Sequence, residues 1–267
     1  MDNKFTVLDF ARKKKDKKKI TMLTAYDYPT AQAVDNCGID AVLVGDSLAM
    51  TVLGYESTVN VTMDEMLHHA RAVRRGVKRA FLIGDMPFMS FQASDEDAVR
   101  NAGRFVKEAG CEAVKIEGGE EVSGRVSAIG KAGIPVVGHI GLTPQSVSKL
   151  GGYKVQGKDD SSAGRLMRDA KALEKAGCLA LILECLPAGL AGEITEKLAM
   201  PTIGIGAGVH CDGQVLVIND IIGLFEKFTP KFVKRYADVN SEIKSAVNKF
   251  REEVESEKFP DDGHSFS

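Results

Sequence analysis

The segment AVLVGDS, residues 41–47, decides the fold class because its form recurs along the chain. A Gly closes a polar, helix-prone stretch, a residue or more follows, and a continuous apolar run then ends in a polar side chain. A Gly just past a helix adopts the left-handed capping conformation without steric cost. Apolar runs without alternation are typical of parallel strands buried on both faces. The pattern returns in AFLIGD (80–85), AVKIEGG (113–119), PVVGHIGL (135–142) and LALILECL (179–186).

Three further apolar runs complete a set of eight. They are ITMLTAY (20–26), PTIGIGAG (201–208) and GQVLVIND (213–220), and helix-prone segments lie between the runs at residues 62–75, 95–108, 120–131, 161–175 and 191–199. Strands that alternate with helices predict βαβ units with right-handed crossovers. Eight such units favour a closed (β/α)₈ TIM barrel over an open doubly wound α/β sheet. Because no Pro/Gly-rich linker interrupts the 267 residues, we expect a single domain over residues 1–267.

Helical extensions are predicted at both ends of this barrel. A short amphipathic helix is expected at residues 6–11, and a long polar helix at about residues 237–257. The long helix exceeds what barrel closure needs, so a peripheral or subunit-contact role is plausible. The basic run RKKKDKKK (12–19) has no interleaved aromatic residues, and we interpret it as a solvated face rather than a nucleic-acid site.

Composition excludes several classes of function. A net charge of −2, with 44% hydrophobic and 27% charged residues, gives no general attraction to nucleic acid or to an anionic membrane. No apolar run is long enough to span a bilayer, and the first residues lack the order of a signal peptide, so we expect a cytoplasmic protein. The five cysteines form no C-x-x-C pair and are interpreted as small buried thiols of a reducing compartment, rather than as metal or redox sites.

Ionisable residues terminate five consecutive predicted strands, where the catalytic groups of a (β/α)₈ barrel lie. Three of them, Asp46, Asp85 and Glu117, are carboxylates on neighbouring strands. They would repel one another in a poorly solvated pocket unless a cation or protons compensated. Hard oxygen ligands without a Cys or His cluster suit Mg²⁺, or Mn²⁺ second. The alternative is that each acid caps a helix or pairs with a neighbouring Lys or Arg.

Three more residues of these strands carry candidate roles. Lys115 shares the inner face with Glu117 because side chains two residues apart on a strand point the same way. It is either neutralised by a carboxylate or holds an anionic substrate. Glu184 ends an unbroken apolar run, which suits a general base, although a salt-bridged structural role competes. His139 could ligate a metal, orient the substrate or form a hydrogen bond within the rim.

The glycine-rich stretch IGIGAG (203–208) superficially resembles a dinucleotide-binding fingerprint. It comes late in the chain, and no helix with a downstream ribose-binding acid follows it in order. We expect the glycines to allow close approach of a ligand or a neighbouring segment. A phosphate cradle after the seventh strand remains the alternative.

Several blocks of the sequence match one known family closely. They include GDSLAMTVLGYEST (45–58), DMPFMSF (85–91), GHIGLTPQSV (138–147), GGYKVQG (151–157) and PKFVKRYADV (230–239). With these blocks, the chain resembles the ketopantoate hydroxymethyltransferase family of pantothenate biosynthesis over nearly its whole length. Glu56 and Asn60 depart mildly from the family pattern, and neither touches the proposed chemistry.

The resemblance implies a barrel of the phosphoenolpyruvate/pyruvate superfamily that forms a homo-oligomer, in many members a decamer. Family metal positions fall on Asp46 and Asp85, with Glu117 as a third acid that acts directly or through water. Positions that contact the keto acid are Asp46, Ser47, Asp85 and Lys115, with His139 as a further active-site position and Glu184 as the general base.

The reaction implied is transfer of a hydroxymethyl unit from 5,10-methylenetetrahydrofolate to 3-methyl-2-oxobutanoate, which forms 2-dehydropantoate. In this hypothesis Mg²⁺ polarises the carbonyl and stabilises an enolate, and Glu184 removes the C3 proton. No folate signature is evident in the residues themselves. Two alternatives are another enolate enzyme of the superfamily, such as a 2-oxo or 2-hydroxy acid lyase, and a non-catalytic barrel that binds a ligand or serves as a scaffold.

Overall fold

A computed structural model describes residues 4–266, and these divide into two compact units with the boundary between Val217 and Ile218. The first unit contains eight parallel strands hydrogen-bonded in chain order into a closed barrel. This confirms the predicted (β/α)₈ barrel; the single domain over all 267 residues stays a prediction. The strands are β1 (Ile20–Thr24), β2 (Ala41–Val44), β3 (Phe81–Asp85), β4 (Ala113–Glu117), β5 (Val136–Gly141), β6 (Ala180–Glu184), β7 (Thr202–Ile205) and β8 (Gly213–Leu216).

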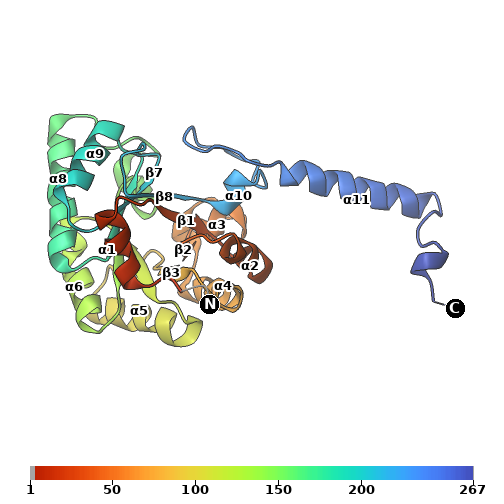
Figure 1. The fold of residues 1–267 in the computed structure, drawn as a ribbon, viewed down its shortest axis with the longest axis horizontal. Helices are drawn as coiled ribbons and strands as arrows, with labels where there is room; N and C mark the ends of the chain where they lie inside the picture. The colour runs from red at the N-terminus through yellow and green to blue at the C-terminus, as the bar shows by residue number, and fades with distance from the viewer. Residues whose placement is uncertain (1–3, 267) are drawn as a thin grey trace. The chain divides into compact units, whose positions relative to one another are not determined.

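Helices connect the strands from β1 to β7 and lie outside them, as Figure 1 shows for α5, α6 and α8, whereas a loop without a helix joins β7 to β8. The crossover helices are α2 (Tyr28–Asn36), α4 (Met63–Gly76), α5 (Asp95–Ala109), α6 (Ser123–Lys131), α8 (Asp160–Ala176) and α9 (Ala188–Lys197). Short elements at the carboxyl ends of the strands are α3 (Leu48–Thr51), α7 (Val147–Leu150), and the 3₁₀ turns η1 (Thr58–Asn60), η2 (Glu120–Val122) and η3 (Pro144–Ser146).

Local sequence explains where these helices begin and end. The Thr62 hydroxyl accepts the Glu65 N–H, and the Glu65 carboxylate accepts the Thr62 N–H, so a capping box starts α4. Ser94 caps α5 by accepting the Asp97 N–H, and Gly110 ends the same helix with φ of 69°. The predicted pattern of a capped helix followed by Gly and an apolar strand is therefore present.

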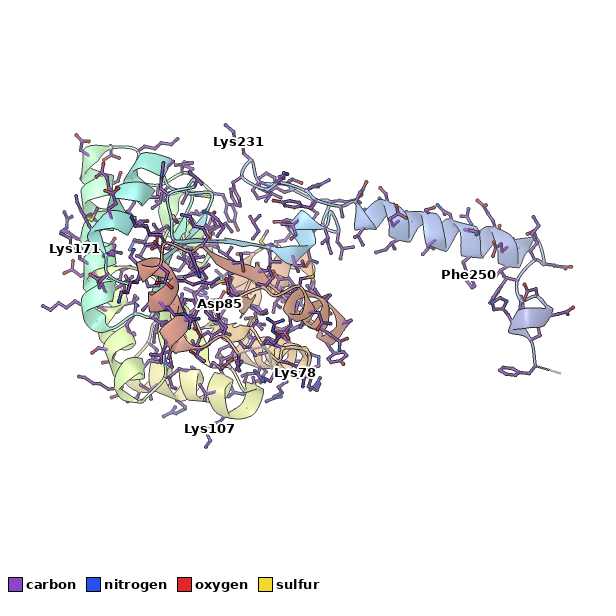
Figure 2. The ribbon with its side chains drawn as sticks, viewed as in Figure 1. Lys78, Asp85, Lys107, Lys171, Lys231 and Phe250 are labelled. Carbon is purple, nitrogen blue, oxygen red and sulfur yellow. The ribbon has the colours of Figure 1, made fainter. Side chains whose placement is uncertain are left out.

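Aliphatic and aromatic side chains fill the barrel interior at its amino-terminal and middle levels. Side chains of β1, β2, β3, β4, β5, β6, β7 and β8 form one buried cluster, whose members include Ile20, Leu43, Ile83, Val137 and Ile182. Buried side chains such as Asp85 lie within the barrel, whereas Lys107 and Lys171 lie at the surface (Figure 2). The first unit therefore has a packed core rather than a central channel.

Helix α1 (Val7–Lys15) covers the amino-terminal end of the barrel. Its Phe10 is fully buried in the interior cluster and packs edge-to-face on Phe81, at 5.3 Å between ring centroids. The helix extends beyond the predicted end at residue 11, because Lys and Arg are good helix formers and favour a helix C-terminus.

The basic run is less solvated than the sequence suggested. Lys13 Nζ lies 2.5 Å from Asp40 Oδ2, and Lys14 Nζ lies 2.7 Å from Asp212 Oδ2. Lys19 donates to the Cys211 carbonyl. The interpretation of residues 12–19 as a solvated face was therefore wrong for Lys13 and Lys14, because acids before β2 and β8 lie against them, whereas Lys19 is exposed as expected.

The glycines of strand β7 and its loop serve close packing. Gly208 has φ of +79°, and a Cβ there would lie 2.4 Å from the Ala188 Cβ at the start of α9. Only Gly tolerates both constraints. This close approach of α9 agrees with the expectation that the glycines let a neighbouring segment pack closely.

The second unit, Ile218–Ser267, contains α10 (Ile218–Ile221), α11 (Val239–Glu255) and the 3₁₀ turn η4 (Asp262–His264). Helix α11 lies within the predicted span of residues 237–257, and Asp238 caps it by accepting the Ser241 N–H. The predicted terminal extensions are thus both present.

Two further expectations concern the chain as a whole. The cysteines are free thiols; Cys111, Cys178 and Cys211 are buried as expected, whereas Cys37 is exposed. Within residues 4–266, no helix combines the length and the apolar composition that crossing a bilayer requires.

Candidate active site

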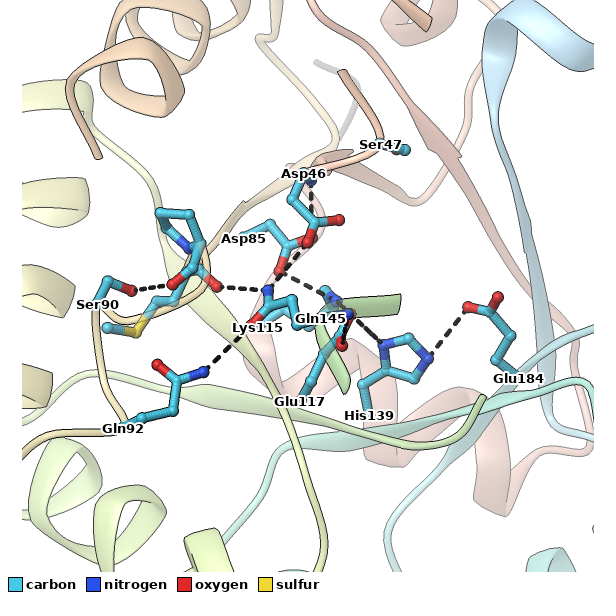
Figure 3. A network of polar contacts seen from close by, with 12 residues as sticks. Asp46, Ser47, Asp85, Ser90, Gln92, Lys115, Glu117, His139, Gln145 and Glu184 are labelled. Atoms are coloured by element: carbon cyan, nitrogen blue, oxygen red, sulfur yellow. Dashed lines mark hydrogen bonds and ion pairs between the residues drawn. The ribbon is translucent and has the colours of Figure 1, made fainter. Parts of the chain in front are cut away.

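The carboxyl ends of β2 to β6 bring the predicted site residues together (Figure 3). Asp85 and Glu117 are the last residues of β3 and β4, and Asp46 follows β2 by two residues. The strand register places Asp85 beside Lys115, and Glu117 beside His139. Side chains alternate along a strand, so every second residue points into the barrel. These inward positions carry apolar side chains in the core and a layer of polar side chains at the carboxyl ends of the strands.

Lys115 lies at the centre of the polar layer, with 3% of its surface exposed. Its Nζ lies 3.0 Å from Asp85 Oδ1 and 3.2 Å from Glu117 Oε1. Burial alone would lower the pKa of Lys115, but the charges of Asp85, Glu117 and Asp46 outweigh burial and raise it. The side chain is therefore a permanent ammonium, and it is neutralised by carboxylates as one of the two sequence-based readings expected.

Glu117 is an ionised carboxylate whose two oxygens are both engaged. Oε1 lies near Lys115 Nζ, and Oε2 accepts the backbone N–H of Gln145 at 3.0 Å. Burial raises its pKa, but the Lys115 charge and contacts with His139 and Gln145 dominate and lower the pKa of Glu117 to about 2. Each oxygen of Glu117 therefore has a partner within the protein and keeps a lone pair for a further donor or a cation.

His139 bridges the two sides of the layer. Its Nε2 lies 3.1 Å from Glu184 Oε2, and its Nδ1 lies 3.0 Å from Lys115 Nζ and 3.4 Å from Glu117 Oε1. Burial and the Lys115 charge lower its pKa, but the carboxylates of Glu117 and Glu184 prevail and raise the pKa of His139 to about 9. In the protonated ring Nδ1 donates toward Glu117, and in the neutral ring it can accept from Lys115.

Asp46 and Asp85 carry an excess of negative charge. Burial, and then the charges of Asp85 and Glu117, raise the pKa of Asp46 well above its ordinary value. Burial also raises the pKa of Asp85, although the Lys115 ammonium opposes this. The Asp85 Oδ2 accepts the Asp46 N–H at 2.9 Å, while Oδ1 is within ion-pair distance of Lys115 without hydrogen-bond geometry.

The charge balance of the layer tests whether a divalent cation fits. Asp46, Asp85, Glu117 and Glu184 supply four carboxylates, against the two cationic groups of Lys115 and His139. Among residues 4–266, no group of three or more His, Cys, Asp or Glu side chains is gathered closely enough to enclose an ion. Mg²⁺ commonly uses one or two carboxylates and completes its shell with water and substrate. Asp46 and Asp85 fit that donor set.

Glu184 stands across the layer from the aspartates, with 15% of its side chain exposed. The Leu142 N–H donates to its backbone carbonyl at 2.9 Å, which ties β6 to the end of β5. Gly141 makes this possible, since it has φ of +99° and a Cβ would lie 2.2 Å from the Glu184 carbonyl oxygen. Cys185, the next residue, holds the left-handed conformation with φ of 51°. A partly accessible carboxylate on a rigid backbone is suited to proton transfer.

Comparison with known proteins decides the family. The sequence model of the ketopantoate hydroxymethyltransferase family matches residues 4–262. The chain belongs to this family. It is 60% identical to the 3-methyl-2-oxobutanoate hydroxymethyltransferase of Syntrophus aciditrophicus over 95% of this chain and 93% of that protein. It is 55% identical to the Geobacter metallireducens enzyme of the same name over all of both chains. The predicted enzyme class, a hydroxymethyltransferase of pantothenate biosynthesis, is confirmed.

Solved structures share the fold of this hydroxymethyltransferase at low sequence identity. A phosphoenolpyruvate phosphomutase from Streptomyces platensis subsp. rosaceus is similar, with a TM-score of 0.60 at 14% identity over 92% of this chain and 88% of that one. A phosphonopyruvate hydrolase complex with oxalate and Mg²⁺ has a TM-score of 0.60 at 13% identity, over 98% and 91% of the two chains. A 2,3-dimethylmalate lyase of the PEP mutase/isocitrate lyase superfamily has a TM-score of 0.55 at 16% identity, over 95% and 87% of the chains. These likenesses agree with the predicted (β/α)₈ barrel fold.

Ser47 lies apart from the polar layer, although the sequence grouped it with the keto-acid contacts. Its hydroxyl lies 2.8 Å from the Tyr26 hydroxyl, which follows β1. Tyr26 is 2% exposed, and its backbone carbonyl lies 2.6 Å from His69 Nδ1 on α4. The other predicted residues are in mutual contact, whereas Ser47 is linked to them by its neighbour Asp46 in the chain.

Two residues of the hydroxymethyltransferase site received no role from the sequence. Tyr26 lies in TAYDYPTA and Gln145 in GHIGLTPQSV, both within segments that resemble the family. Gln145 is 5% exposed and hydrogen-bonds Asp46 with its side chain and Glu117 with its backbone. An uncharged residue in a loop shows no strand-end position and no charge pattern, so only tertiary contacts reveal it.

Proposed function

We propose that this hydroxymethyltransferase uses 5,10-methylenetetrahydrofolate as its one-carbon donor and a divalent cation, Mg²⁺ or Mn²⁺, as its cofactor. The small-molecule keto acid is 3-methyl-2-oxobutanoate, the substrate in the names of its relatives. The observation that carries the proposal is the buried excess of carboxylates beside Lys115, with a further carboxylate, Glu184, on the opposite side.

In this proposal Asp46 and Asp85 hold the cation, and Glu117 is the third acid, acting directly or through a water molecule. When bound, such a cation acts as a Lewis acid that polarises the 2-oxo group and disperses the charge of an enolate. The raised pKa of Asp46 supports this assignment, because a buried carboxylate surrounded by other carboxylates needs positive charge nearby.

The chain's own groups orient the keto acid. Lys115 carries the fixed positive charge of the layer. Its ion pairs with Asp85 and Glu117 keep the ammonium in one position when an anionic substrate binds. Together with Asp46, Asp85, Ser47 and His139 it forms the proposed keto-acid site. A planar 2-oxo carboxylate held at two points loses rotational freedom, which brings its C3 hydrogen to a fixed position.

Glu184 is the proposed general base. It breaks the C3–H bond by taking the proton, and the electron pair moves into the C2–C3 bond of the enolate. His139 Nε2 lies 3.1 Å from Glu184 Oε2, within ion-pair distance of the proposed base. The enolate carbon then forms a bond to the methylene carbon of the donor as a C–N bond of the folate breaks. Water then replaces the second folate nitrogen on the same carbon and supplies the hydroxyl oxygen. The C3 proton and one proton of the water pass to the two folate nitrogens, so the products are 2-dehydropantoate and tetrahydrofolate.

Exchange of the C3 proton in D₂O tests the first step without folate. We expect the parent with Mg²⁺ to exchange the C3 hydrogen of 3-methyl-2-oxobutanoate, and Glu184→Gln to lose about 10²- to 10⁴-fold of that rate. Glu193→Gln is a matched control, because Glu193 is an exposed residue of α9. Exchange at the parent rate in Glu184→Gln would remove Glu184 as the base.

Assembly and location are further parts of the proposal. Helix α11 carries an apolar stripe, 45–60% exposed in the single chain, formed by Ile243, Val247, Phe250 and Val254. Such a stripe on a polar helix supports association, and we propose a homo-oligomer, by family resemblance a decamer, acting in the cytoplasm. Sedimentation velocity tests this: a monomer at micromolar concentration would contradict it.

A further inference from the structure

Gln145 is an uncharged residue of the polar layer, and it contacts acids that come from separate strands. It is the second residue of η3, directly after β5, and is buried. We propose that Gln145 is a positioning residue that fixes the Asp46 and Glu117 carboxylates relative to each other, and thereby sets the affinity of the site for its divalent cation. The inference rests on the proposed function, because it assumes that these carboxylates serve a cation.

The side chain of Gln145 has one orientation that satisfies its neighbours. Its Nε2 donates to Asp46 Oδ2 at 2.9 Å and to the Met86 carbonyl at 3.0 Å. Both of these partners are acceptors, so the NH₂ group and not the carbonyl must face them. On the other side, Gln92 Nε2 donates to Gln145 Oε1 at 3.4 Å. The amide is therefore fixed between Asp46 and Gln92, as Figure 3 shows.

The backbone of the same residue holds the second acid. The Gln145 N–H donates to Glu117 Oε2 at 3.0 Å. Pro144 precedes Gln145 and restricts the backbone at the start of η3, so this N–H is directed before any ligand arrives. One residue from β5's loop thus hydrogen-bonds an acid that follows β2 and an acid that ends β4.

This arrangement affects a cation more than it affects the fold. A hydrogen bond to Asp46 Oδ2 restricts rotation of the carboxylate, so less freedom is lost when an ion binds. Partners of this kind orient metal ligands, and their loss commonly weakens metal binding by about 10- to 100-fold. An amide is also the appropriate group, because a carboxylate at the same position would add a fifth negative charge beside Asp46.

Mn²⁺ binding to the full-length protein, measured by titration calorimetry and by electron paramagnetic resonance of the free ion, tests the inference. We expect Gln145→Met, which keeps the size and the backbone N–H, to bind Mn²⁺ about 10- to 100-fold more weakly than the parent. We expect Gln145→Glu to bind Mn²⁺ more tightly than the parent, or to lose less affinity than Gln145→Met does. Its added charge attracts the ion while it repels Asp46. Gln32→Met is the control, because Gln32 is exposed on α2 and should bind Mn²⁺ as the parent does.

A merely structural role predicts a different result. In that case Gln145→Met lowers the unfolding midpoint of the metal-free protein but leaves the Mn²⁺ dissociation constant within twofold, and this outcome overturns the inference. The proposed role predicts that saturating Mn²⁺ restores kcat in the variant, while half-maximal activity requires more metal.

Two further outcomes are distinguishable. If Gln145→Met does not fold, Gln145→Asn decides, because it retains a buried amide and the backbone N–H but withdraws the side chain from Asp46; parent-like affinity in Gln145→Asn overturns the inference. If the parent itself fails to bind Mn²⁺ or Mg²⁺, the cation assignment of the proposed function fails, and the inference fails with it.

Discussion

The two ends of the barrel both carry buried or half-buried charges, but they are built differently. At the amino-terminal end, Lys13 pairs with Asp40 and Lys14 pairs with Asp212, so each cation has a carboxylate of its own. Phe10 fills the space between the strands. This end closes the core with balanced charge and apolar packing.

At the carboxyl end the charges are more deeply buried and do not balance. Asp46, Asp85 and Glu117 are 5% exposed or less, and the ammonium of Lys115 is shared between Asp85 and Glu117. Burial of like charges together destabilises the chain unless a further cation or protons compensate. The difference teaches that buried charge by itself does not mark a functional site, whereas buried charge without balance does.

The largest effect is expected when the Lys115 ammonium at the carboxyl end of the barrel is removed. Lys115→Met leaves Asp85 and Glu117 buried without their common partner, so we expect about 3–5 kcal/mol loss in the free energy of unfolding. The exchange of substrate C3 protons should also fall below detection. Urea unfolding and the D₂O assay measure the two effects, and a variant as stable and active as the parent would remove Lys115 from its central role.

A substitution in the core at the amino-terminal end should lower the stability of the protein without changing its catalytic activity. Phe10→Ala empties a fully buried position in the core and should lower the free energy of unfolding by about 3 kcal/mol. Activity per folded molecule should stay within twofold of the parent. A lower kcat in the fully folded variant would show that the two ends are coupled.

The carboxyl end should also give the metal-free protein a distinctive pH dependence. Because the pKa of His139 is raised from 6.5 to about 9, the folded protein holds this proton more tightly than the unfolded chain. The stabilisation is fully present below pH 6.5 and is lost as the pH rises through about 9, about 3 kcal/mol in total. His139→Gln should flatten urea-unfolding free energies between these pH values; an unchanged slope would contradict the pKa shift.

A smaller effect of opposite sign is expected at Asp46. Asp46→Asn removes one uncompensated buried charge, and its amide oxygen can still accept from Gln145 Nε2. In chelator at neutral pH, we expect the variant to gain about 1 kcal/mol in the free energy of unfolding. The same variant should lose stabilisation by Mn²⁺. Destabilisation in chelator would mean that the charge at the carboxyl end is balanced after all.

The smallest effect is expected for the matched lysine at the amino-terminal end. Lys14→Met breaks a pair whose side chains are each 17% exposed, and Asp212 still accepts the Thr202 N–H at 2.9 Å. We expect a loss of about 1 kcal/mol or less, with unchanged activity. A loss as large as that of Lys115→Met, measured by the same urea titration, would erase the proposed difference between the ends.

Much of this protein follows from the sequence alone. Runs such as AVLVGDS and AVKIEGG fix the parallel strands, because two-sided burial requires continuous apolar residues and a Gly fits the turn before them. The period of two along a strand also placed Lys115 and Glu117 on one inner face. The grouping of Asp46, Asp85 and His139 followed from strand ends that meet at one rim.

The tertiary structure alone decided which groups touch. Whether Lys115 paired with an acid or stayed free depended on the register of β3 and β4, which sets distances that no spacing along the chain encodes. The roles of Gln145 and Tyr26 also depended on it, because uncharged loop residues carry no periodic signal. The pairing of Lys14 with Asp212 joins residues 198 positions apart, and only the closed barrel brings them together. Sequence periodicity records which face a residue occupies, whereas hydrogen bonds depend on contacts between segments that are remote along the chain.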